Sequence, residues 1–103
     1  MTDELVIVAG TFMVDPARRA EFLEGRLESI LASRGDRGCL EYTMSADAVD
    51  PALVRLFEMW TSMDDLQAHV QRIRASPPGE GGVPVLGRDM KIYVHAQEQP
   101  FGS

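Results

Sequence analysis

The segment from Leu5 to Val14 constrains the fold more than any other part of the chain, because it is apolar on both sides. It is rich in β-branched and apolar residues and stops at Asp15-Pro16, a pattern typical of a strand. Successive side chains of a strand point to opposite faces of the sheet. One face would therefore carry Leu5, Ile7, Ala9, Thr11 and Met13, and the other Val6, Val8, Gly10, Phe12 and Val14. Both faces of such a sheet need an apolar cover.

A helix is predicted to follow this strand. Asp15 is placed to cap the helix, and Pro16 suits its first position. Gly35 marks the predicted end. The residues that recur between them at helical spacing are Leu23, Leu27, Ile30, Leu31 and Arg34.

Two strands are predicted next, at residues 39–45 and 53–60, and the polar loop at 46–52 is short enough to pair them antiparallel. In the first of these strands one face would carry Leu40, Tyr42 and Met44, and the other Cys39, Glu41 and Thr43. In the second, one face would carry Val54, Leu56, Glu58 and Trp60.

A second helix is predicted to begin at Thr61 or Ser62. Its inward side would carry Leu66, His69, Val70 and Ile73. The stretch at 76–82 is rich in proline and glycine and is interpreted as a surface loop, with a lid over a pocket as the alternative. The last strand is predicted at residues 91–97, where Tyr93 and His95 would share a face.

The order strand, helix, strand, strand, helix, strand is the split βαβ arrangement, so we expect an α+β fold of the ferredoxin-like βαββαβ kind with an antiparallel sheet. Two helices can cover one face of that sheet. The other face is also apolar, and no further element of the chain is left to cover it. A second copy of the chain is the economical cover, so we expect a homodimer.

Length and charge narrow the class of protein. A chain of 103 residues fits one domain spanning residues 1–103. The net charge of −6 and the scattered basic residues argue against a nucleic-acid partner. No apolar run is long enough to span a membrane, and the acidic start is unlike a signal peptide. With a single cysteine, Cys39, which we interpret as a buried strand residue, the expected location is the cytoplasm.

Three residues form the candidate catalytic group. Glu58 and Trp60 lie two apart on one strand and share a face, and an inward His69 from the following helix can reach the same space. Imidazole is the natural base for removing a phenolic or enolic proton, a carboxylate beside it can orient it, and an indole offers a flat apolar wall. The alternative for each is a structural role: a satisfied core histidine, a paired carboxylate and a packing tryptophan.

Other side chains are candidates for substrate binding. Tyr42 and Met44 would project from the second strand, Leu56 from the third and Thr11 from the first. Packing in the core is the alternative for each of these side chains. The sequence has no histidine, cysteine and aspartate cluster at metal-ligand spacing and no flavin, nicotinamide or phosphate-binding motif, so we expect neither a metal nor a cofactor.

Four local patterns resemble the antibiotic biosynthesis monooxygenase domain, and the likeness covers nearly the whole chain. They are Val8-Ala9-Gly10-Thr11-Phe12 before Pro16, then Gly38-Cys39-Leu40-Glu41-Tyr42, then Phe57-Glu58-Met59-Trp60, and Leu66-Gln67-Ala68-His69. The resemblance implies a dimeric α+β barrel with an apolar pocket between the sheet and the helices of each subunit. Members of this family oxygenate anthrone-like polyketides without a cofactor, oxidise quinols, degrade haem or act on small signal molecules.

The resemblance is incomplete at two places. Haem degraders of this group carry an asparagine on the first strand, which the stretch Ala9-Gly10-Thr11 lacks, and many members carry a second histidine where Arg74 stands here. The leading hypothesis is a cofactor-independent monooxygenase that acts with O2 on a small hydroxylated aromatic, an anthrone-like polyketide or a quinol. The alternatives are a non-catalytic dimeric binding module for an aromatic metabolite and a small-signal-molecule isomerase on the same scaffold.

Overall fold

The computed structural model describes residues 4–76 and 82–102 of the chain. Four strands form one sheet in the order β2-β3-β1-β4, and every neighbouring pair is antiparallel. The strands are β1 (Val6–Met13), β2 (Cys39–Ala46), β3 (Leu53–Trp60) and β4 (Gly87–Tyr93). With helices between β1 and β2 and between β3 and β4, this is the predicted ferredoxin-like α+β architecture, with β2 and β4 at the two edges of the sheet.

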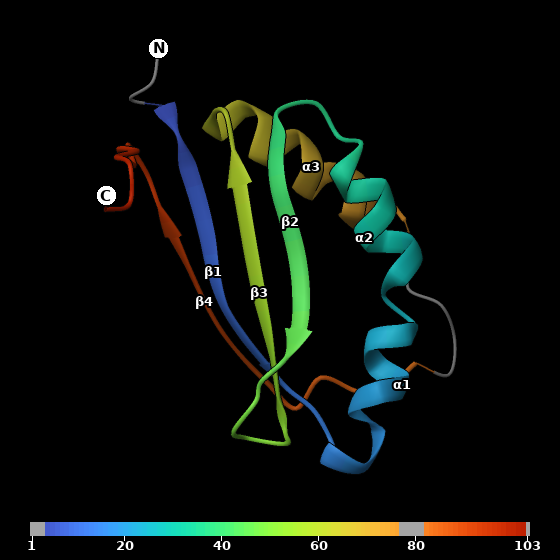
Figure 1. The fold of residues 1–103 in the computed structure, drawn as a ribbon. Helices are drawn as coiled ribbons and strands as arrows, with labels where there is room; N and C mark the ends of the chain where they lie inside the picture. The colour runs from blue at the N-terminus through green and yellow to red at the C-terminus, as the bar shows by residue number, and fades with distance from the viewer. Residues whose placement is uncertain (1–3, 77–81, 103) are drawn as a thin grey trace.

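The helices lie together on one side of the sheet (Figure 1). They are the single 3-10 turn η2 (Pro16–Arg18), α1 (Arg19–Glu24), α2 (Leu27–Arg34) and α3 (Met63–Ala75). α1 and α2 pack over β2, and α3 packs against β3. No helix in the described part of the chain is long and apolar enough to cross a membrane.

The core lies between the sheet and these helices, as the alternation in β3 predicts. Every second side chain of that strand is buried beneath the helices: Val54, Leu56, Glu58 and Trp60. The matching residues of β1 are Val6, Val8 and Phe12. Leu66 and His69 of α3 are buried against them, so the inward direction predicted for His69 is confirmed.

The predicted first helix is interrupted. Asp15 does cap it, accepting a hydrogen bond from the backbone N–H of Ala17, but the helix breaks at Gly25 and α2 restarts at Leu27. Glycine is a weak helix former, which fits a break at this position. Leu27 and Leu31 belong to the predicted helical spacing, but their side chains are 55% and 66% exposed, so that spacing does not mark a buried side of α2. The side chains buried on α1 and α2 are Phe22, Ile30 and Ser33.

A bulge at the start of β2 changes which side chains face the core. Cys39 lies opposite Trp60, but Glu41 lies opposite the next residue, Met59, so Leu40 has no partner in the ladder. Leu40 is exposed, and Cys39 is half-buried against the core. The predicted faces are therefore wrong at these two positions, and the alternation from Tyr42 onward holds.

The last strand occupies residues earlier than predicted. β4 pairs antiparallel with β1 from Gly87, opposite Met13, to Tyr93, opposite Ile7. His95 lies beyond the strand with a φ of 56°, so the prediction that it shares a strand face with Tyr93 was wrong. The predicted loop at 76–82 lies almost entirely outside the described residues.

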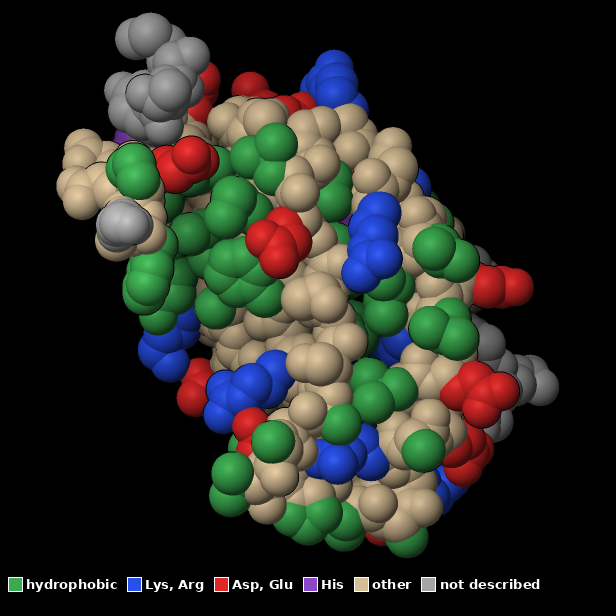
Figure 2. All heavy atoms as spheres, in the orientation of Figure 1, with side chains coloured by type: hydrophobic (Ala, Val, Ile, Leu, Met, Phe, Trp, Pro, Cys, Tyr) green, Lys and Arg blue, Asp and Glu red, His purple; other side chains and the backbone are tan. Residues whose placement is uncertain are grey.

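The sheet face that points away from the helices is open in the single chain, and Figure 2 shows it with hydrophobic side chains gathered over β1 and β4. Ile7 lies between Met59 and Tyr93 in the ladder, and Ala9 lies opposite Phe57. Ile7, Ala9, Phe57 and Met59 are half-buried, and Tyr93 is exposed. This face matches the predicted second apolar side of β1.

Candidate functional site

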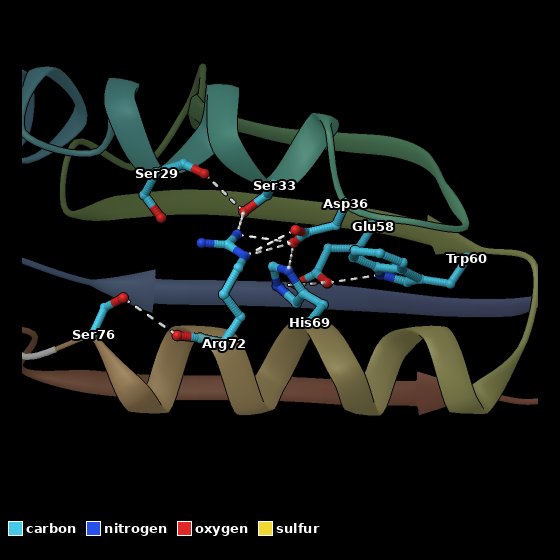
Figure 3. A network of polar contacts seen from close by, with 8 residues as sticks. All are labelled: Ser29, Ser33, Asp36, Glu58, Trp60, His69, Arg72 and Ser76. Atoms are coloured by element: carbon cyan, nitrogen blue, oxygen red, sulfur yellow. Dashed lines mark hydrogen bonds and ion pairs between the residues drawn. The ribbon is translucent and has the colours of Figure 1, made fainter.

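The buried polar site lies where α3 crosses the end of β3. Ser62 caps α3 by accepting a hydrogen bond from the backbone N–H of Asp65, so the helix begins at Met63, with only two residues between it and the end of β3. His69 lies on the side of α3 that faces the sheet and is 5% exposed. The end of β3 contributes Glu58 and Trp60 to the same space, so the predicted catalytic group lies together (Figure 3).

His69 is held by a carboxylate from a distant part of the chain. Its Nδ1 lies 2.7 Å from Oδ2 of Asp36, in the turn between α2 and β2. Arg72, one turn further along α3, donates to both oxygens of that carboxylate, with Nε 2.8 Å from Oδ1 and Nη2 2.9 Å from Oδ2. Burial opposes ionisation of Asp36, but the hydrogen bonds from Arg72 and His69 outweigh it and lower the pKa of this carboxyl.

Glu58 lies on the other side of the His69 ring. Its Oε1 accepts a hydrogen bond of 2.9 Å from Trp60 Nε1, and the same oxygen lies 3.9 Å from His69 Nε2, an ion-pair distance too long for a hydrogen bond. Burial raises the pKa of the Glu58 carboxyl, and the bond from Trp60 and the nearby His69 offset part of that rise. The imidazole therefore lies between two carboxyl groups whose pKa values are shifted in opposite directions. The lowered pKa keeps Asp36 ionised, and the raised pKa favours the neutral form of Glu58.

Aromatic rings enclose the imidazole. The ring centroid of Trp60 lies 4.6 Å from that of His69, and the centroid of Tyr42 lies 5.4 Å away, both tilted. Burial, with a smaller effect from the Glu58 charge, raises the pKa of Tyr42 to about 12, so its hydroxyl keeps its proton near neutral pH. The walls of the site are thus apolar, with the Tyr42 hydroxyl as a neutral polar group.

Cross-strand pairing arranges the predicted substrate-binding residues. Tyr42 lies opposite Glu58 and Met44 lies opposite Leu56, all on the side of the sheet that the helices cover. Thr11 is different: it pairs with Arg55 and Asp89 and has the strand parity of the open face. The structure therefore brings Tyr42, Met44 and Leu56 to the helix side with His69 and leaves Thr11 on the other face.

A surface hollow of about 330 Å³ runs along the edge strand β2. Its lining consists of Arg34, Cys39, Leu40, Glu41, Tyr42 and Thr43. Arg34 donates a hydrogen bond of 2.8 Å from Nε to the backbone carbonyl of Tyr42, which occupies part of this otherwise unpaired edge. Tyr42 belongs to both regions, since it lines the hollow and its ring lies beside His69.

The sequence interpretation missed three residues of the network. Asp36 lies in a turn of glycines and charged residues, Arg72 is one of several basic residues of its helix, and Ser33 carries no sequence signal of its own. Ser33 is fully buried; its Oγ donates to the backbone carbonyl of Ser29 and accepts from Arg72 Nη2 at 3.3 Å. The spacing of Arg72 three residues after His69, on the same helix side, was the one local signal available.

The arrangement is suited to moving a proton. An imidazole can both accept and donate a proton, and an ionised carboxylate beside one of its nitrogens can orient the ring for that exchange. Within residues 4–76 and 82–102, no group of three or more histidine, cysteine or acidic side chains is arranged to hold a metal ion. Asp36, His69 and Glu58 form a donor set suited to acid–base chemistry, and aromatic rings enclose it.

Comparison with known proteins agrees with the fold. The chain is 28% identical over 99 residues to an uncharacterized protein of the cyanobacterium Synechocystis, which covers 94% of this chain and 67% of that protein. A candidate antibiotic biosynthesis monooxygenase from Deinococcus radiodurans superimposes with a TM-score of 0.76 at 21% identity, covering 95% of this chain and 99% of that one. A protein from Pseudomonas aeruginosa gives a TM-score of 0.71 at 24% identity, covering 94% and 99%.

At these identities the solved structures establish the fold and leave the chemistry open. The family model described as antibiotic biosynthesis monooxygenase matches residues 5–74, which span β1 to nearly the end of α3 and include Asp36, Glu58, Trp60, His69 and Arg72. The match covers more than half of the chain and confirms the family that the local patterns indicate. The chain belongs to the antibiotic biosynthesis monooxygenase family.

Proposed function

We propose that this chain is a cofactor-independent monooxygenase of a small hydroxylated aromatic compound, an anthrone-like polyketide or a quinol, with His69 as the general base. The observation that carries the proposal is the 2.7 Å contact between His69 Nδ1 and an ionised Asp36, with the Trp60 ring beside the imidazole. An imidazole anchored at one nitrogen by a carboxylate is suited to accept a proton at the other nitrogen, because the carboxylate stabilises the imidazolium that forms.

The reaction needs only the substrate and O2. His69 Nε2 takes the proton of a phenolic or enolic hydroxyl, and the resulting electron-rich anion bonds to O2 through carbon. Loss of water from the peroxide converts a methylene between two aromatic rings into a ketone, R–CH2–R′ + O2 → R–CO–R′ + H2O. The substrate supplies all four electrons, one oxygen atom enters the product and the other leaves as water. A quinol would instead give up two electrons and two protons, QH2 + O2 → Q + H2O2, which is an oxidase reaction of the same site because no oxygen atom enters the product.

Trp60, Glu58 and Tyr42 have supporting roles in this proposal. The indole of Trp60 offers a flat wall for an aromatic ring. Glu58 accepts a hydrogen bond from the indole N–H and faces His69. Because Tyr42 lines the hollow along β2 and also contacts His69, we propose that substrate reaches the base past Tyr42, with Met44 and Leu56 beside it. Thr11 lies on the open face, so in this proposal it belongs to the dimer interface and not to the substrate site.

The working unit in this proposal is a homodimer of single domains, each spanning residues 1–103. Half-buried Ile7, Ala9, Phe57 and Met59 on the open face support it, because an apolar sheet face of that kind needs a cover.

The test is O2 uptake with an anthrone and a quinol as substrates. His69→Ala should lower the rate by about 100-fold, a typical contribution of a positioned general base. The matched control is His95→Ala, which alters the other histidine of the chain, beyond β4, and should leave the rate within a factor of two of wild type. An unchanged rate in His69→Ala, with the fold preserved by circular dichroism, would remove His69 from the mechanism.

A second candidate function is a non-catalytic binding module for an aromatic metabolite. It is favoured by the burial of His69, which is 5% exposed with each ring nitrogen facing a carboxylate, as in a structural network. A panel of quinones and anthrones separates the two candidates by thermal melting with and without O2. A rise in Tm with a ligand that is never consumed would favour the binding module.

A further inference from the structure

Asp36 occupies a position that no local pattern in the sequence marks. It makes the one hydrogen bond of His69 to another side chain in the described part of the chain, although 33 positions separate the two residues. We propose that Asp36, held by Arg72, is a positioning residue that fixes the proton of His69 on Nδ1 and so leaves Nε2 as the basic nitrogen. The catalytic meaning of this role rests on the function proposed above, but the position of the proton does not.

The carboxylate is itself fixed before it meets the imidazole. Arg72 holds both of its oxygens in the two-pronged geometry that guanidinium and carboxylate groups share, with contacts of 2.8 Å and 2.9 Å. Nη2 of Arg72 also donates to Ser33, which is anchored on α2 by its bond to Ser29 (Figure 3). Asp36 therefore has little freedom to rotate, and Oδ2 is kept in the direction of His69.

Charge and geometry then select one tautomer of the neutral ring. An ionised Asp36 has no hydrogen to donate, so a 2.7 Å contact requires hydrogen on His69 Nδ1. The lone pair must then be on Nε2, which points toward Glu58 and lies 3.9 Å from Oε1. Without Asp36 nothing in the described part of the chain holds hydrogen on Nδ1, and the ring is expected to return to the tautomer that a free histidine side chain prefers, with hydrogen on Nε2.

A purely structural clamp is the competing explanation. The Asp36 contacts join the turn after α2 to α3, and a clamp of that kind would change stability without needing one tautomer. The two explanations differ in a spectroscopic signature, since the nitrogen shifts of a neutral imidazole tell which nitrogen carries hydrogen.

The experiment measures the 15N shifts of His69 at pH 8, above the usual titration range of histidine. Wild type should show hydrogen on Nδ1, and Asp36→Ala should move it mainly to Nε2. Asp36→Glu keeps the carboxylate and should restore the wild-type signature at least in part. The matched control, Asp65→Ala, removes a carboxylate that pairs with Arg37 and should leave the His69 spectrum unchanged.

Each outcome decides the proposal. Hydrogen on Nε2 in wild type overturns it directly, so it remains falsifiable even where Asp36→Ala does not fold. Hydrogen that stays on Nδ1 in folded Asp36→Ala overturns it as well. The expected signatures, joined by at least a tenfold loss of O2 uptake in Asp36→Ala, support it together with the function. The same signatures in a protein that consumes no O2 support the positioning role and count against the monooxygenase alone.

Discussion

At the scale of single residues, Glu58 is the group whose environment departs most from what a carboxylate prefers. It is 6% exposed, its hydrogen-bond donor is the neutral Trp60 indole, and no arginine or lysine pairs with it in the described part of the chain. Burying a charge with so little compensation costs stability, which is why burial raises the pKa of Glu58.

The sign of the pH dependence follows from this shift. A carboxyl whose pKa is higher in the folded than in the unfolded protein does not lower the free energy of unfolding at a pH below its ordinary pKa of 4.5, because it is then protonated in both states. The protein loses stability as the pH rises from there through the pKa of the folded state, where the buried carboxyl must ionise. Glu58→Gln keeps an oxygen to accept from Trp60 and has no charge. It should raise Tm at pH 8 by about 4 °C, the shift that roughly 1 kcal/mol produces in a domain of this size.

Thermal melting from pH 4 to pH 8 checks this expectation. The advantage of Glu58→Gln should shrink toward pH 4, where wild-type Glu58 is protonated in both states. A control substitution, Glu41→Gln, alters an exposed carboxylate on β2 and should give no such trend. A wild-type protein more stable than Glu58→Gln at pH 8 would mean that the ionised carboxylate is stabilised by its site.

At the scale of elements, the pairing of β1 with β4 depends on one close approach. A Cβ added at Gly10 would overlap the backbone oxygen of Asp89 and would lie 2.7 Å from the Cα of Met90. These are backbone atoms of β4, so rotation of a side chain cannot relieve the contact. Gly10 is thus required by the spacing of two strands, where the sequence alone shows only a weak strand former.

Gly10→Ala should therefore lower the free energy of unfolding by about 2 kcal/mol, in the range typical of overpacking. Gly87→Ala is the matched control in the same strand pair, because a Cβ at that position would lie an ordinary 3.8 Å from Met13. Urea unfolding of the two variants should give a clear loss for the first and a change below about 0.5 kcal/mol for the second. Equal stabilities would show that β4 shifts easily away from β1.

At the scale of the whole molecule, the open sheet face determines the expected assembly. The helices cover only one side of the sheet (Figure 1), and hydrophobic side chains gather on the uncovered side (Figure 2). By their places in the ladder, half-buried Phe57 and Met59 and exposed Tyr93 belong to that side. A sheet face of this kind gains free energy when a second apolar surface covers it.

The protein should therefore sediment at twice its 11.4 kDa mass at micromolar concentration. Phe57→Glu places a charge in the centre of the open face and should shift the protein to monomer. Val49→Glu places the same charge on a side chain that is 91% exposed in the loop between β2 and β3, and should leave the dimer intact. A monomeric wild type would contradict the predicted dimer. A dimeric Phe57→Glu variant would show that the dimer forms through another surface.

Much of the architecture was predictable because it is encoded in local periodicity. The bounds of β3, its buried face and the inward direction of His69 all follow from alternation or from helical spacing. Prediction failed where a neighbour in space decides the outcome. Gly25 interrupts a helix that apolar spacing continues, a bulge turns Leu40 outward, and pairing with β1 places β4 at Gly87–Tyr93, earlier than predicted.

The sequence by itself thus determined the order of elements, the covered side of the sheet and the meeting of Glu58, Trp60 and His69, because neighbours along a strand or helix have fixed relative directions. Only the tertiary structure decided what holds the histidine. Asp36 and Arg72 meet across 36 positions of sequence, in a contact that exists once α2, its turn and α3 are packed on the sheet. The orientation of the proposed base therefore depends on a long-range contact that no local pattern encodes.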